Sequence, residues 1–164
     1  MSTEKRAVNR TVPAARPDVV EINPADGSLA IAWQLRSLLV GAAQLVAHQI
    51  ACMDGELVDH DLEAAKAYLD RTADEARKVA SALDPLTGPN PKPSCALDAL
   101  QLNRNLKARI VAALAQLDAL DCRDDNPGHI WDALNLLEVT ESVRQRFEDE
   151  ALQLHRRLAP KVVA

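Results

Sequence analysis

Histidine and cysteine side chains recur at a few positions whose spacing suits metal binding. His48 and Cys52 are four residues apart, so both side chains share one face if this segment is helical. Cys122 or His129 would complete a tetrahedral site of the kind that zinc prefers. The spacing matches no zinc-finger pattern, and free cysteines often serve only as small buried residues. The sequence therefore offers this metal site as an alternative to its main interpretation.

His48 and His60 also suggest phosphoryl transfer, because helical bundles with an exposed histidine can carry a phosphoryl group. Phosphotransfer domains typically place Lys and Gly three and four residues after that histidine. Ala51 and Cys52 stand at those positions here, and His60 falls at the start of a predicted helix. Phosphotransfer is therefore a second, weaker alternative.

Motifs of the familiar enzyme classes are missing from the chain. There is no glycine-rich phosphate loop, and no G-x-S-x-G, H-E-x-x-H or C-x-x-C pattern occurs. Glu150 and His155 are five residues apart, whereas the Glu-x-x-His pairs of di-iron bundles are three apart. We therefore expect a protein that is not an enzyme and that needs no cofactor.

Four long segments with helical hydrophobic periodicity would position these side chains. Strand-forming residues never cluster in alternating runs, and the apolar residues are mainly Ala, Leu, Val and Ile. One segment keeps a heptad seam at Leu62, Ala65, Leu69, Thr72, Ala76, Val79 and Leu83. In the next segment, Asn103, Arg104, Lys107 and Gln116 fall mainly off the apolar face. The predicted helices span about 28–54, 59–84, 95–121 and 127–159.

Connections between these helices set the predicted topology. Short loops make the first and second helices, and the third and fourth, antiparallel neighbours. A proline-rich linker over 84–94 joins the two hairpins, so we predict an all-α, antiparallel up-down-up-down four-helix bundle over 26–164. Residues 1–25, which lack apolar periodicity and hold three prolines, are predicted to form a flexible N-terminal arm. Alternatively, each hairpin pairs with that of a second copy, giving a homodimer.

The first helix carries its polar residues along one narrow line, which we call the polar stripe: Gln34, Ser37, Gly41, Gln44 and His48. A helix that is apolar on its other sides is either central to the core or covered by a partner. Glycine costs about 1 kcal/mol relative to Ala inside a helix, and it often permits close backbone approach. The stripe is therefore either a solvent strip or a groove for a partner helix or for self-association.

Acidic residues gather where the predicted topology brings the first loop and the last loop to one end of the bundle. This acidic pole contains Asp54, Asp59, Asp61, Asp121, Asp124 and Asp125. Acidic side chains favour helix N-termini, which accounts for some of them without a function. The functional alternative is a docking site for a basic partner segment, attracted by the field of the pole.

Composition narrows the class of function. The net charge of −5 argues against nucleic-acid binding and against adsorption to anionic membranes. Three cysteines and no visible signal sequence favour a reducing, cytoplasmic location. Aromatic residues make up only 2% of the chain, which disfavours a small-molecule pocket. We therefore expect an interaction module, such as an adaptor, small chaperone or regulator, that binds a basic or helical protein partner through the polar stripe or the acidic pole.

Overall fold

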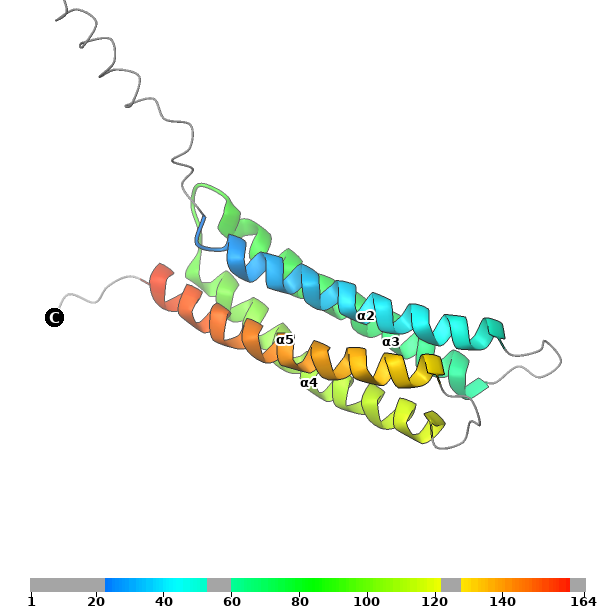
Figure 1. Ribbon diagram of the computed structural model, residues 1–164. Coiled ribbons are helices and arrows are strands. Elements are labelled where there is room, and N and C mark those ends of the chain that lie inside the picture. Colours follow the sequence, from blue (N-terminus) through cyan, green and yellow to red (C-terminus); the bar gives the residue numbers. More distant parts are fainter. Residues whose placement is uncertain (1–22, 53–59, 122–127, 160–164) are drawn as a thin grey trace, which may run out of the picture.

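The structure is a computed structural model of the chain and describes residues 23–52, 60–121 and 128–159. Within these ranges the chain forms four long α-helices and one short 3-10 helix, without strands. The four α-helices lie side by side along a common direction (Figure 1). The predicted all-α four-helix bundle is therefore confirmed. The elements are α2 (Asp26–Cys52), α3 (His60–Leu83), η1 (Asp84–Thr87), α4 (Pro93–Asp121) and α5 (Gly128–Leu158).

The four helices are arranged in a square, and each helix packs against two neighbours. The extensive contacts are α2 with α3, α3 with α4, α4 with α5, and α5 with α2. Successive helices run antiparallel, so the topology is up-down-up-down (Figure 1). The end of α2, the start of α3, the end of α4 and the start of α5 consequently share one end of the bundle. This end is the pole to which the sequence assigned the acidic and ligand-type residues.

The core is built from small and medium aliphatic side chains, as the composition requires. Every residue of the heptad seam predicted between Leu62 and Leu83 is buried. Phe147, the only phenylalanine of the chain, is fully buried on α5. The core on α2 is formed by Leu35, Leu39, Ala42 and Val46, each fully buried.

The proline-rich linker is more structured than the sequence suggested. Asp84–Thr87 forms η1, and Leu86 within it is buried. Asn23 ties the chain before α2 to this turn, because its Nδ2 donates to the carbonyl oxygen of Leu86 at 3.3 Å. The Asn23 Oδ1 also accepts a hydrogen bond from the Ala25 N–H at 2.9 Å. The start of α2 is thus fixed against the linker.

Where the predicted helix boundaries fall on described residues, they agree with the observed ones within two residues, whereas the predicted ends at 54, 59 and 127 lie outside the described residues. α4 begins two residues earlier than predicted, at Pro93, because proline suits the first turn of a helix, where its missing N–H is not needed. The predicted cap of the last helix, Asn126 with Pro127, lies outside the described residues, as does most of the predicted N-terminal arm.

Candidate functional site

The polar stripe lies along the seam between α2 and α5. Gln34, Ser37, Gln44 and His48 are exposed to solvent, whereas Gly41 is half-buried. A Cβ atom added at Gly41 would lie 3.0 Å from Cδ2 of Leu136 on α5. The close approach predicted at Gly41 therefore occurs, but the neighbour is a helix of the same chain. Gly41 itself does not offer an open groove, and only the residues around it can meet a partner.

The solvent-facing side of α2 carries almost no charge. We call this surface the α2 outer face, and its exposed residues are Ala30, Trp33, Gln34, Ser37, Gln44, His48 and Ala51. Between Gly27 and Cys52 the only formally charged side chain is Arg36, which is half-buried. Its guanidinium lies 5.9 Å from the ring centroid of Trp33, and its Nε is buried without a hydrogen-bond partner. Trp33 nevertheless stays 41% exposed.

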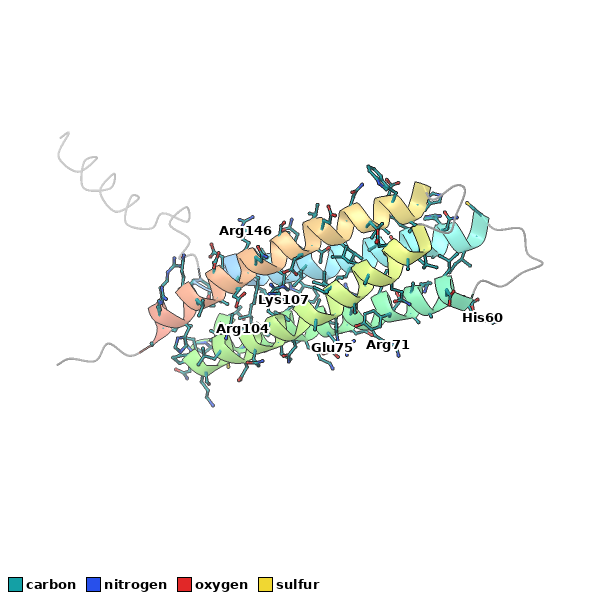
Figure 2. All side chains as sticks on the ribbon, turned by 90° about the horizontal axis from the view of Figure 1, so that it is seen from below. His60, Arg71, Glu75, Arg104, Lys107 and Arg146 are labelled. Atoms are coloured by element: carbon teal, nitrogen blue, oxygen red, sulfur yellow. The ribbon has the colours of Figure 1, made fainter. Side chains whose placement is uncertain are left out.

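The solvent-facing side of α3 has the opposite character. Its exposed charged residues are Asp61, Glu63, Asp70, Arg71, Asp74, Arg77 and Lys78. Two ion pairs run along this helix, with Lys66 Nζ 2.7 Å from Asp70 Oδ2 and Lys78 Nζ 2.8 Å from Glu75 Oε1. Figure 2 shows Arg71 and Glu75 on the outer side of α3. This is the ordinary pattern of a helix that faces water, and the α2 outer face departs from it.

Three of the four predicted ligand residues come together where α2 ends and α5 begins. We call His48, Cys52 and His129 the His–Cys cluster. The rings of His48 and His129 are stacked, with centroids 5.8 Å apart and an angle of 29° between the planes. The Sγ atom of Cys52 lies 3.9 Å from Nε2 of His129. His48 and Cys52 are exposed, and His129 is half-buried.

The fourth predicted ligand, Cys122, lies outside the described residues. Within the part of the chain that the structure describes, no group of three or more His, Cys, Asp or Glu side chains has an arrangement that could hold a metal ion. His60, the alternative phosphoryl acceptor, is separate from the His–Cys cluster. It lies at the tip of α3 (Figure 2), and its Nδ1 is 3.9 Å from Oε2 of Glu63 on the same helix.

Only part of the predicted acidic pole can be described. Asp61 is exposed in the first turn of α3, and Asp121 is the last residue of α4. Asp54, Asp59, Asp124 and Asp125 lie outside the described residues. A shallow cavity of about 180 Å³ opens here and is lined by Asp61, Gln116, Ala119 and Leu120. Among the described residues of its lining, Asp61 is the one carboxylate, which is too little to specify a basic partner by itself.

A buried polar cluster between α4 and α5 escaped the sequence analysis. Arg144 is only 2% exposed, and its guanidinium makes two hydrogen bonds of 2.7 and 2.8 Å to the carboxylate of Glu141. Asn103 is fully buried, contrary to the prediction that it lies off the apolar face. Its Nδ2 donates to the backbone oxygen of Arg144 at 3.1 Å, which satisfies the amide nitrogen, whereas its Oδ1 is buried without a hydrogen-bond partner.

Ion pairing in this cluster extends to the surface. Arg104 on α4 donates from Nε to Glu148 on α5 at 2.8 Å, and Nη1 of Arg144 lies 3.6 Å from the other oxygen of Glu148. The hydrogen bond from Arg104 lowers the pKa of Glu148. The hydrogen bonds to Glu141 raise the pKa of Arg144. These groups bond to one another and join α4 to α5, so we assign them a structural role.

The spacing along α5 contained a signal for Arg144. Leu137, Thr140, Phe147, Ala151 and Leu154 are all buried. A residue at 144 continues their 3-4 spacing, so periodicity alone would have placed this arginine on the inner face.

Comparisons with known proteins give no further guide to function. A scan against protein-family models found no match, and neither did searches of curated proteins and of solved structures. Among the described helices, α2 alone is long and apolar enough to cross a membrane by length and composition. Core helices of soluble proteins pass the same test, and α2 buries nine residues inside the bundle.

Proposed function

We propose that this protein is a non-enzymatic interaction module that binds a helical segment of a partner protein along the α2 outer face. The observation that carries the proposal is the near absence of charge on this face. The centres of protein interfaces are depleted of charged residues and enriched in Trp. Trp33 lies exposed on this face, and Ser37 and Gln44 provide uncharged hydrogen-bonding groups beside it.

A helical partner suits this surface better than an extended one. The described chain offers no sheet edge that could pair with a strand, whereas two neighbouring helices can seat a third in the shallow groove between them. The polar stripe follows the α2–α5 seam, and Val139 on the outer side of α5 is 51% exposed. The partner helix would contact both α2 and α5, on either side of the close contact between Gly41 and Leu136.

The acidic pole is a weaker basis for function. Much of it lies outside the described residues, and exposed carboxylates at helix starts are ordinary. Docking of a basic segment there stays a prediction. The α2 outer face is favoured because its lack of charge departs from what a solvated helix normally shows.

Site-specific cross-linking in the cells that make the protein tests this proposal. A photoreactive residue replaces Gln44 on the α2 outer face or, as the matched control, the exposed Ala67 on α3. We expect a discrete adduct from position 44 and none from position 67. A second copy of the chain would appear as an adduct of twice the chain mass.

Charge insertion provides the complementary measurement. Ser37→Glu should abolish the adduct from position 44, because a desolvated carboxylate without a partner opposes binding. Its free energy of unfolding should change by no more than about 0.5 kcal/mol, since Ser37 is exposed. Equal adducts from both positions, or none from position 44, would refute the proposed surface.

A further inference from the structure

The His–Cys cluster has a chemistry that docking along the α2 outer face does not use. We propose that His48, Cys52 and His129 bind one divalent transition-metal ion, with zinc as the best match. Two imidazoles and one thiolate are the donor types that zinc takes in proteins, and a water molecule can fill the fourth position. His48 also belongs to the α2 outer face, but the contacts that carry this proposal are separate from the lack of charge that carries the proposed function.

The first supporting observation is the distance between the thiol and one imidazole. Zinc–sulfur bonds of about 2.3 Å and zinc–nitrogen bonds of about 2.0–2.1 Å place the two ligand atoms about 3.5 Å apart in a tetrahedral site. Cys52 Sγ and His129 Nε2 are 3.9 Å apart. A shift of a few tenths of an ångström would therefore let both atoms reach one ion.

The second observation is the separation of the two rings. Imidazoles that share a tetrahedral ion have ring centroids about 5 Å apart, by the same bond lengths. The centroids of His48 and His129 are 5.8 Å apart. The rings are stacked instead of converging on one point, which is why these side chains do not form a site as they stand. His48 is exposed, so its ring can turn about its broad terminal torsion at little cost.

Charge around the cluster favours a cation moderately. His48 and Cys52 lie in the last turns of α2, where the helix dipole is negative, whereas His129 lies in the first turn of α5, where it is positive. The fields of the two helix dipoles therefore have opposite effects on a cation bound at the cluster. The exposed acidic residues at this pole shift the balance towards a cation: Asp61, Glu63, Asp118 and Asp132.

A bound ion would connect two distant parts of the chain. Cys52 and His129 are 77 residues apart in sequence, and they belong to helices that pack against each other. Because the unfolded chain does not hold these ligands together, the ion would bind the folded state preferentially and stabilise it by mass action.

Cobalt(II) titration tests the proposal on the full chain, purified without a histidine tag and kept reduced under anaerobic conditions. A coordinated thiolate gives cobalt a charge-transfer absorption in the near ultraviolet. We expect this absorption to saturate at one equivalent of cobalt and to disappear when zinc is added. We also expect the midpoint of thermal unfolding to rise with the metal.

Single substitutions then assign the ligands. Cys52→Ser should remove the charge-transfer absorption and the rise in the unfolding midpoint. His48→Ala and His129→Ala should each weaken cobalt binding by at least the roughly 10-fold that loss of an outer-shell partner costs. The matched controls are Cys95→Ser and His155→Ala, which change the same residue types at the opposite end of the bundle and should leave binding unchanged.

Several outcomes would overturn the proposal. One is the absence of a saturable complex with one equivalent of metal. Others are a charge-transfer absorption that survives Cys52→Ser, and an equal loss of binding in the control variants, which would mean adventitious binding only. Circular dichroism of each metal-free variant shows that the bundle is intact, so a loss of binding is not confused with unfolding.

Discussion

α5 packs against its two neighbours by opposite means. In the middle of its contact with α2 the packing is close and apolar, because Gly41 has no side chain there and Leu136 lies against it. Its contact with α4 contains a buried arginine and a buried asparagine, and the asparagine side chain donates a hydrogen bond to the backbone oxygen of the arginine. One helix thus has a close apolar seam on one side and a polar seam on the other.

This difference separates two tasks in the bundle. Aliphatic side chains make no directional bonds, so the α2–α5 seam fixes mainly how close the helices approach. The two hydrogen bonds across the α4–α5 seam form only when Asn103 lies opposite Arg144 and Arg104 lies opposite Glu148, although Asn103 Oδ1 and Arg144 Nη1 are buried without a hydrogen bond. We infer that the polar seam fixes the axial register of the bundle. The apolar seam is left with an uncharged outer surface that a partner can use.

Of the substitutions that test this difference between the two seams, replacing the buried Arg144 should change the free energy of unfolding most. Arg144→Ala removes the hydrogen bonds to Glu141 and the packing of a side chain that is 3% exposed. Breaking a buried pair leaves a carboxylate without its partner, so we expect a loss of about 2–4 kcal/mol in the free energy of unfolding. Urea denaturation followed by circular dichroism measures this loss.

Arg146 provides a control for Arg144→Ala on the same helix. It is exposed and projects away from the bundle (Figure 2), so Arg146→Ala should change stability by less than about 0.5 kcal/mol. Similar losses of stability in the two variants would mean that the buried arginine stabilises the bundle no more than an exposed one. The inference that the polar seam fixes the register would then fail.

The apolar seam should respond to size instead of charge. Gly41→Leu places a branched side chain against Leu136, and overpacking of this kind typically costs about 1–3 kcal/mol. Gly41→Ala is the matched variant, because its single Cβ meets only the flexible end of Leu136 at 3.0 Å. The gain in helix propensity of about 1 kcal/mol offsets that contact, so its stability should stay close to wild type.

Thermal unfolding of the two glycine variants measures this difference. If Gly41→Leu is as stable as Gly41→Ala, the seam is looser than the 3.0 Å contact indicates. Because Gly41→Leu disturbs the bundle itself, it is a poor probe of partner binding. Ser37→Glu serves that purpose better, since Ser37 is exposed.

Periodicity and turn residues were enough to predict the helices and their order. The 3-4 spacing of aliphatic residues marks which side of a helix is buried, and proline marks the breaks between helices. Topology then placed His48, Cys52 and His129 at one pole, and the structure brings them into contact.

Features that depend on the register between helices could not be predicted from the sequence. The neighbour of Gly41 could not be known, because one helix sequence does not say which residue of another helix lies opposite. Asn103 was misplaced for a related reason, since its burial depends on the Arg144 carbonyl that satisfies it. Polar residues are ordinarily assigned to the surface, and only a partner on another helix reverses that assignment.

The smallest effect we predict distinguishes ion pairs between helices from ion pairs within one helix. The hydrogen bond from Arg104 holds the pKa of Glu148 below its ordinary value of 4.5, whereas the unfolded chain keeps that value. The native state therefore binds fewer protons in this acid range. The stability contributed by Glu148 is complete above pH 4.5 and is lost as the pH falls through the lowered pKa.

Glu148→Gln should remove that part of the acid dependence, with a loss below about 1 kcal/mol at neutral pH, because the Glu148 carboxylate is partly exposed. Glu75→Gln provides the comparison. The hydrogen bond from Lys78 also lowers the pKa of Glu75, but Lys78 and Glu75 are three residues apart on the same helix, α3. The free energy of unfolding of Glu75→Gln should therefore depend on pH more nearly as that of the wild type does than the free energy of Glu148→Gln. The free energy of unfolding, measured from pH 7 down to pH 3, could fall equally in the wild type and in Glu148→Gln. The ion pair between Arg104 and Glu148 would then stabilise the bundle no more than an ion pair within one helix. In that case the register between α4 and α5 would depend on Arg144 and Asn103 alone.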